Sequence, residues 1–156
     1  SLKKAIDLDK NYVEAYNNLG GTLKNLGQQQ AAVKCFERAF AIKLDYAEPY
    51  NNLGNTLKEL GRLNEAEASY RQAIVLKPDS IMAYNKLGLM LQQINCLDEA
   101  EISLRQALKI KPDDTAANAG LGLLLANLGQ HRESLEYLRI GCGSIVFDTK
   151  NGLFIE

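Results

Sequence analysis

A unit of 34 residues recurs along nearly the whole chain, and this recurrence restricts the possible folds more than any other feature. The dipeptide Leu-Gly appears four times at the same interval, with no residue inserted between copies, at Leu19-Gly20, Leu53-Gly54, Leu87-Gly88 and Leu121-Gly122. Repeats in one frame are typical of a solenoid, in which each structural unit packs only on its neighbours. We therefore expect an extended array of small units.

The copy at residues 47–80 predicts what one unit folds into. Its first half carries one apolar stripe at helical spacing, formed by Tyr50, Leu53, Leu57 and Leu60. Gly61 follows the stripe and can adopt the left-handed conformation that ends a helix. A second stripe runs up to Pro78, which stops a helix because proline has no backbone N–H. Each unit is thus predicted to be a helix–turn–helix whose apolar faces are buried by stacking.

This unit resembles a tetratricopeptide repeat. The signature of that family comprises an aromatic residue, a Leu-Gly pair, a turn glycine, two alanines around a second aromatic residue, and a closing proline. In this copy they are Tyr50, Leu53, Gly54, Gly61, Ala66, Tyr70, Ala73 and Pro78. Gly54 and Ala66 are small where two helix backbones would come closest, since a larger side chain would force them apart. The resemblance covers residues 1 to about 140 and implies an all-α fold, a right-handed superhelix of about four repeats.

The repeat register predicts the organisation of the whole chain. The segments are 1–12 (second helix of a partial repeat), 13–46, 47–80 and 81–114 (three full repeats), 115–140 (a degenerate fourth repeat) and 141–156. Lys10 stands where Pro78 closes a repeat. Asn95 takes the place of the turn glycine in the third repeat, and asparagine tolerates positive φ better than most residues. In the fourth repeat Asn118 replaces the aromatic residue and Ser134 replaces the first alanine.

The last segment, 141–156, changes its pattern. Two runs rich in β-branched and aromatic residues, 145–147 and 153–155, flank a turn-forming stretch that ends in Gly152. This arrangement predicts a β-hairpin. Three roles are open for it: a cap on the last repeat, the start of a downstream domain, or an exposed edge that pairs with another chain.

Composition and charge exclude several classes of function. The formal net charge is -1 and no basic stripe stands out, so we expect no nucleic-acid partner. No run of 18 apolar residues occurs, so we expect no membrane span. The three cysteines, Cys35, Cys96 and Cys142, are far apart and form no metal-binding pattern. We expect reduced thiols and a cytoplasmic location.

The sequence contains no convincing catalytic constellation. His131 is the single histidine and follows the turn glycine of the fourth repeat, with no nucleophile implied beside it. Acidic clusters lie at the starts of second helices, where they suit the helix dipole. The glycines at 20–21 and 120–122 lie within helical patterns, which is the wrong context for a phosphate loop. We predict no enzymatic activity, no cofactor and no metal.

The first helices carry the candidate binding residues. In tetratricopeptide folds these helices line the concave groove, and by this resemblance the site residues are Asn17, Asn18, Asn51, Asn52, Asn55, Asn85 and Lys86. An amide both donates and accepts hydrogen bonds, so a row of asparagines can hold the backbone of an extended peptide. The row is similar to the asparagine ladder of O-linked N-acetylglucosamine transferase repeats. The alternative is a hydrated polar face that binds nothing.

A second family mode is not expected. Chaperone-binding members hold a terminal carboxylate with two lysines, an arginine and two asparagines. This chain has Asn55 and Lys86 in suitable positions, but Met82, Ala116 and Gly120 stand where further polar or basic partners would be needed.

We therefore predict a non-catalytic scaffold that binds a peptide or protein segment in its groove. Two alternatives remain open. The chain could be the substrate-recruiting arm of a larger enzyme, such as a glycosyltransferase or a methyltransferase. It could also be a self-assembly module that forms homo-oligomers through exposed repeat ends or through the hairpin.

Overall fold

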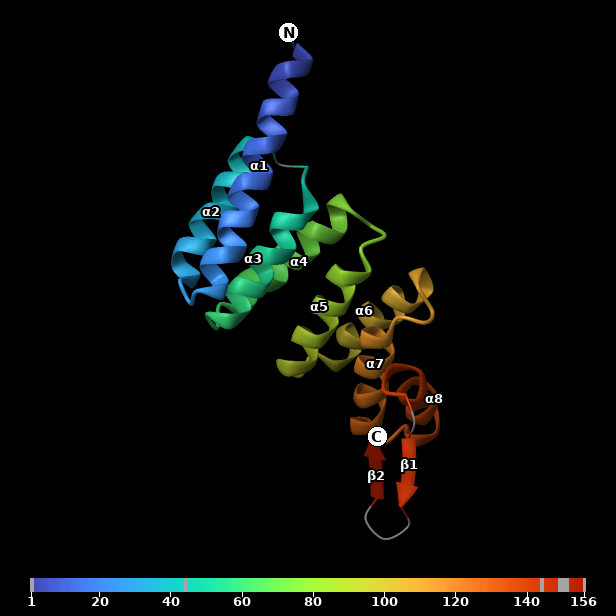
Figure 1. Cartoon of the computed structure of the whole chain (residues 1–156). Coiled ribbons are helices and arrows are strands. Elements are labelled where there is room, and N and C mark those ends of the chain that lie inside the picture. Colours follow the sequence, from blue (N-terminus) through green and yellow to red (C-terminus); the bar gives the residue numbers. More distant parts are fainter. Residues whose placement is uncertain (1, 44, 144, 149–151, 156) are drawn as a thin grey trace. The chain divides into compact units, whose positions relative to one another are not determined.

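The computed structural model describes residues 2–43, 45–143, 145–148 and 152–155, and side chains within 12–43 and 45–143. Figure 1 shows the helices and strands in chain order. They are α1 (Leu2–Asn25), α2 (Gln29–Ile42), α3 (Ala47–Glu59), α4 (Leu63–Leu76), α5 (Ile81–Gln93), α6 (Leu97–Ile110), α7 (Thr115–Asn127), α8 (His131–Gly141), β1 (Ile145–Asp148) and β2 (Gly152–Ile155).

The helices belong to two compact units, each of which is described by itself. The first unit spans residues 1–78 and contains α1 to α4; the second spans 79–156 and contains α5 to α8 and the strands. In both units consecutive helices pack in pairs, and the second helix of one pair packs on the first helix of the next. The first helices also lie beside each other, α1 beside α3 and α5 beside α7. This stacking buries stripes that a single pair would leave exposed.

The turn inside each pair contains one residue with a left-handed backbone. Gly27, Gly61 and Gly129 have φ of 75°, 74° and 77°, and Asn95 has φ of 64°. Asn95 is the only non-glycine residue with positive φ in the described part of the chain. The prediction that asparagine replaces the turn glycine in the third repeat is confirmed, because its side chain tolerates this conformation.

Small residues set the distance between the two helices of each pair. A Cβ on Gly54 would lie 2.6 Å from Tyr70 Cε1, and one on Gly20 would lie 2.6 Å from Phe36 Cε1. The other two pairs repeat this contact between a glycine and a large residue 16 positions later, in Gly88 with Leu104 and Gly122 with Leu138. The predicted need for a small residue at Gly54 is thus confirmed, because a larger side chain would collide with the Tyr70 ring.

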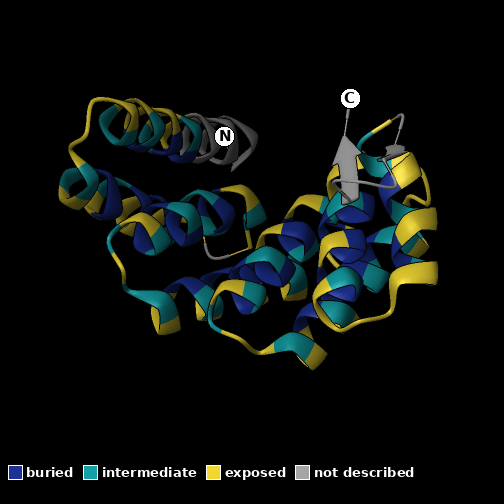
Figure 2. Ribbon diagram, turned by 90° about the horizontal axis from the view of Figure 1, so that it is seen from below, coloured by how far each residue is buried: buried dark blue, intermediate teal, exposed yellow. Residues whose placement is uncertain are grey.

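The core is a row of small and large apolar residues between the paired helices. Figure 2 shows the buried residues on the sides of the helices that face their partners. The signature alanines of the second helices are fully buried, at Ala32, Ala39, Ala66, Ala73, Ala100 and Ala107. Asn118, which replaces an aromatic residue, is 1% exposed and its Nδ2 donates to the carbonyl oxygens of Pro112 and Asp114, both at 2.9 Å. These bonds allow a polar side chain in the core.

One helix crosses the expected repeat boundary at residue 12. α1 runs without interruption from Leu2 to Asn25, so the second-helix segment 1–12 and the first helix of the next repeat form one helix of 24 residues. Lys10 keeps the backbone N–H that proline lacks, and nothing in the following residues forces the chain out of the helical conformation.

The predicted fold class also needs a correction at its C-terminal end. The repeat fold is entirely helical, and all eight helices of the described chain belong to it. The strands β1 and β2 pair only with each other, with Ile145 opposite Ile155, and add no element to the helix pairs. The hairpin is therefore not part of the repeat architecture. Its predicted roles as cap, domain start or exposed edge depend on side chains outside the described residues.

Candidate peptide-binding face

The structure places the seven predicted site residues in both units. Asn17 and Asn18 lie on α1, and the three predicted asparagines of the second repeat lie on α3 beside it. Asn85 and Lys86 lie on α5 in the second unit. Each unit thus presents its own part of the predicted face.

Asn17 belongs to a hydrogen-bond network that joins α1 to α3. Its Nδ2 donates to Glu48 Oε1 at 3.1 Å, and its Oδ1 accepts from Asn52 Nδ2 at 2.8 Å. The Tyr46 hydroxyl donates to the other carboxylate oxygen of Glu48 at 2.9 Å. Asn17 is 4% exposed. Its amide therefore connects neighbouring repeats and is already satisfied.

Two tyrosines of the first unit hold their protons firmly. Burial, the hydrogen bond to Glu48 and the nearby negative charges raise the pKa of Tyr46 to about 12. Burial, together with the charge of Glu59, raises the pKa of Tyr70 well above its usual range. The Tyr70 hydroxyl donates to Asn55 Oδ1 at 2.9 Å. Both hydroxyls are therefore permanent donors near neutral pH, and the Asn55 amide N–H groups remain available.

The asparagines differ in what they can offer a ligand. Asn18 is exposed and its side chain forms no hydrogen bond with the described residues. Asn52 and Asn55 are half-buried and each has one side-chain group bonded within the unit. Asn51 is 6% exposed and its buried Oδ1 has no partner in the described structure. Among the predicted asparagines of the first unit, Asn18, Asn52 and Asn55 thus keep accessible polar groups.

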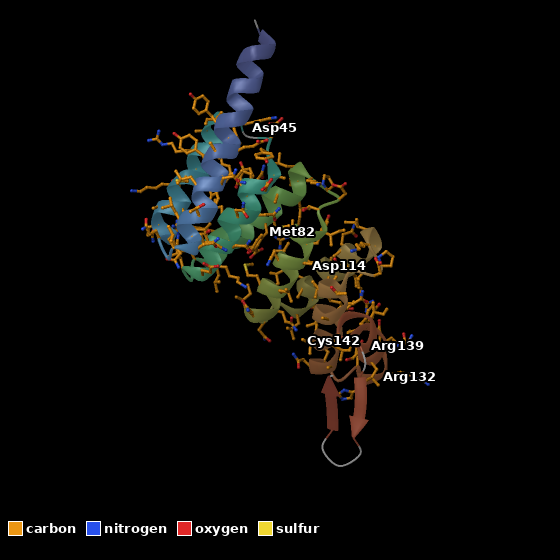
Figure 3. The ribbon with its side chains drawn as sticks, in the orientation of Figure 1. Asp45, Met82, Asp114, Arg132, Arg139 and Cys142 are labelled. Carbon is orange, nitrogen blue, oxygen red and sulfur yellow. The ribbon has the colours of Figure 1, made fainter. Side chains whose placement is uncertain are left out.

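The predicted residues of the second unit border a cleft of about 380 Å³. Asn85 donates through Nδ2 to Asp114 Oδ1 at 2.8 Å, and the same oxygen accepts from the Ala117 backbone N–H at 3.0 Å. Asp114 is therefore the N-cap of α7. The cleft is lined by Ile81, Met82, Asn85, Lys86, Leu89, Lys111, Asp114 and Ala116. Figure 3 labels two of these residues, Met82 on α5 and Asp114 before α7.

Sequence reasoning missed two of these polar residues. Asp114 directly precedes the apolar run of α7, and an aspartate in that position is a signal for an N-cap. Lys111 follows the end of α6 and recurs at the repeat period as Lys43 and Lys77, but this period indicates a helix end and not a binding residue.

A separate polar cluster ties α6 to α8. Arg105 donates to Glu101 Oε1 at 2.7 Å, to Glu133 Oε1 at 2.8 Å and to the Tyr137 hydroxyl at 3.0 Å. Its guanidinium carbon also lies 5.8 Å from the Tyr137 ring centroid. The hydrogen bond to Glu133 raises the pKa of Arg105 above the already high value of a free guanidinium group. Because two carboxylates neutralise this charge, the cluster joins helices and leaves little attraction for an outside anion.

The described residues contain few features of other site types. They include no group of three or more His, Cys, Asp or Glu side chains placed to hold a metal ion. Cys35, Cys96 and Cys142 are free thiols, and His131 is exposed at the start of α8. Among the described helices, none combines the length and the apolar character needed to cross a bilayer.

Comparison with protein families gives matches along most of the helical part. A family model described as "TPR repeat" matches residues 22–61 and 54–95, and two models described as "Tetratricopeptide repeat" match residues 1–34 and 83–114. Together these matches cover residues 1–114. No curated protein matches the sequence.

Solved structures show a similar fold. A crystal structure of MamA is 27% identical, with a TM-score of 0.77, and the match covers 89% of this chain and 81% of that chain. MamA from Desulfovibrio magneticus RS-1, residue 41 to its end, is 22% identical with a TM-score of 0.72, over 83% of this chain and 73% of that one. The first TPR domain of Spaghetti (RPAP3), bound to the HSP90 peptide SRMEEVD, is 18% identical with a TM-score of 0.72. The match covers 76% of this chain and 94% of that chain.

Proposed function

The chain belongs to the tetratricopeptide repeat family, and on this basis we propose that it is a non-catalytic scaffold that binds an extended peptide along the face of its first helices. Domains of this fold are typically interaction modules, and the RPAP3 domain is an example with a peptide bound. Solenoids suit this role because stacked repeats present one continuous surface.

One observation carries the proposal. On α1 and α3, which lie side by side, Asn18, Asn52 and Asn55 keep side-chain groups that no described residue satisfies. Asn18 offers both a donor and an acceptor, Asn52 offers Oδ1 and Asn55 offers Nδ2. An extended peptide exposes alternating N–H and C=O groups, so its backbone can bond to such a row with little dependence on its side chains. The similarity to an asparagine ladder is part of this proposal.

We would test it with linear peptides selected from a random displayed library on the whole chain. The affinity of a selected peptide is then measured by fluorescence anisotropy with the wild type and with Asn18→Ala. We expect the variant to bind about 5- to 10-fold more weakly, the range that follows from losing one or two hydrogen bonds worth about 1 to 1.4 kcal/mol in total. Asn18 is preferred over Asn52 because the Asn52 amide also supports Asn17.

Asn64→Ala is the matched control, since Asn64 is an exposed asparagine on α4 and not on a first helix. It should bind the peptide as the wild type does. Equal affinity of Asn18→Ala and wild type would reject the asparagine row, and a selection that enriches no peptide would reject the scaffold itself.

A further inference from the structure

The cleft between α5 and α7 differs from the equivalent place in the first unit. Two repeats, or 68 residues, separate equivalent positions, so Asn85 corresponds to Asn17, Ala116 to Glu48 and Gly120 to Asn52. In the first unit Asn52 and Glu48 satisfy both ends of the Asn17 amide. Ala116 and Gly120 have no side-chain polar group. Asp114 replaces the lost acceptor, but no described residue replaces the lost donor.

Asn85 is therefore left with one unsatisfied atom. A carboxylate only accepts hydrogen bonds, so the contact with Asp114 fixes the amide with Nδ2 toward Asp114 and Oδ1 turned away. Asn85 is 7% exposed and its Oδ1 has no partner in the described structure. Buried acceptors are rarely left unpaired in folded proteins. A partner for this oxygen would be an N–H or O–H donor in the place that the Asn52 amide takes in the first unit.

Leu89 lies beside Gly120, the residue that stands in the position of Asn52. Its Cδ2 lies 3.1 Å from where a Cβ of Gly120 would be, so it occupies part of the room that an asparagine side chain fills in the first unit. Its equivalent in the first unit is Gly21.

The charges of the cleft favour an acidic ligand. Lys86 and Lys111 both line it, and neither ammonium group forms an ion pair with the described residues. The one carboxylate of the lining, that of Asp114, already accepts hydrogen bonds from Asn85 and from the backbone of α7. Lys86 replaces the neutral Asn18 of the first unit. Two ammonium groups without partners attract a carboxylate, most strongly at low salt.

The remaining lining is apolar. Met82 is 58% exposed at the edge of the cleft and is joined by Ile81 and Leu89. The position equivalent to Met82 in the first unit is Glu14, which would repel an acidic ligand. Methionine adapts its flexible side chain to ligands of different shape.

From these features we infer that the cleft binds an internal, extended peptide segment in which an apolar residue adjoins acidic residues. A backbone N–H of the segment donates to Asn85 Oδ1, a carboxylate lies between Lys86 and Lys111, and the apolar side chain packs on Met82. This inference rests on the proposed peptide-binding function and adds the chemistry of the peptide.

The test uses two fluorescein-labelled probes with amidated C-termini, SRMEEVD and SRMQQVN, in which the three acidic residues are replaced by their amides. The amide removes the terminal carboxylate, so only internal acidic groups are compared. Anisotropy titrations at low salt should show the acidic probe binding the wild-type chain at least 10-fold more tightly. The double variant Lys86→Gln/Lys111→Gln should reduce this preference to 2-fold or less.

Lys34→Gln/Lys109→Gln is the control for net charge, because both lysines are exposed and lie outside the cleft. It should keep the preference. Met82→Glu should weaken the acidic probe about 10-fold, whereas Met82→Gln should change its affinity far less. Circular dichroism of each variant should match the wild type.

Three outcomes would overturn the inference: equal affinity for the two probes, no binding of the acidic probe at about 1 mM chain, or an unchanged preference after both cleft lysines are replaced. These results leave the proposed function standing when selected peptides still bind and Asn18→Ala still weakens them. When no selected peptide binds either, the proposed function fails as well.

Discussion

Tyr70 shows how one side chain links the core of a repeat to the candidate binding face. Its ring is fully buried against Gly54, and its hydroxyl donates to Asn55 Oδ1. The bond fixes the orientation of the Asn55 amide, so that Nδ2 is the group left for a ligand. A residue of the helix-packing signature thereby positions a residue of the proposed site.

Tyr70→Phe is expected to lower the free energy of unfolding by about 1 kcal/mol, the usual net contribution of one hydrogen bond. The ring still fills its space, so no cavity opens. Urea denaturation followed by circular dichroism measures the change. Tyr84→Phe is the matched control, because the half-buried Tyr84 hydroxyl has no hydrogen bond within the described structure, and it should change stability by less than about 0.5 kcal/mol. Equal losses in both variants would contradict the role of the Asn55 contact.

For single residues, the sequence predicted which helix a side chain lies on better than it predicted whether that side chain is buried or exposed. It placed the asparagines on the first helices correctly, yet Asn17 and Asn85 are buried while Asn18 is exposed. Adjacent positions on a helix differ by about 100° in direction, so repeat spacing alone does not say which one faces the next repeat. The partners of Asn17 lie 31 and 35 residues away, on another helix pair, and no local pattern indicates such contacts.

Each helix pair is held at a short distance by a glycine facing a large side chain. Gly20 and Gly21 are neighbours in α1 but have opposite surroundings. A Cβ on Gly20 would collide with the Phe36 ring, whereas a Cβ on Gly21 would have no atom within 4 Å. Substituting alanine at each of these two glycines therefore separates the effect of packing, which acts at Gly20, from the effect of helix propensity, which acts at both.

Gly20→Ala is expected to destabilise the chain by about 1 to 3 kcal/mol, because the added methyl group overpacks the α1–α2 contact. Gly21→Ala should instead stabilise it by up to about 1 kcal/mol, since alanine restricts the unfolded chain and favours the helix. Both changes can be read from urea midpoints. A shift of both variants in the same direction would show that the Phe36 contact does not determine the outcome.

Helix ends were predictable wherever a turn residue marked them. Gly27, Gly61, Asn95 and Gly129 all lie in the turns that the repeat register predicted. The junction near Lys10 was predicted from the register alone, without proline or glycine, and there the helix continues. Repeat period locates equivalent residues, but a helix ends only where the backbone is obliged to leave it.

At the scale of the whole molecule, the chain divides into two compact units, residues 1–78 and 79–156, and the helix pairs within each unit pack on one another. Each unit contains two complete helix pairs, so each can bury its own apolar stripes. A single 13-residue helix such as α5 is only marginally stable in water without such a partner.

Fragments 1–78 and 79–156 are therefore expected to be helical and to unfold cooperatively on heating. A fragment of residues 1–95 ends between α5 and α6, and its α5 amides should exchange hydrogen rapidly. Circular dichroism and hydrogen exchange provide the two readouts. The division into units would be refuted by a 79–156 fragment without helical signal, or by an α5 in 1–95 as protected as in the whole chain.

The constant distance along the sequence between each glycine and the large residue that it contacts has a consequence for how such a gene can change. Gly20 and Phe36, Gly54 and Tyr70, Gly88 and Leu104, and Gly122 and Leu138 are all 16 residues apart and lie within one repeat. After a duplication or deletion of 34 consecutive codons within the repeats, every surviving glycine still has a large residue 16 positions later, either its own partner or the equivalent residue of another repeat. Ancestors of this chain could thus gain or lose whole repeats in one genetic event, with no second mutation needed to restore the packing inside a pair.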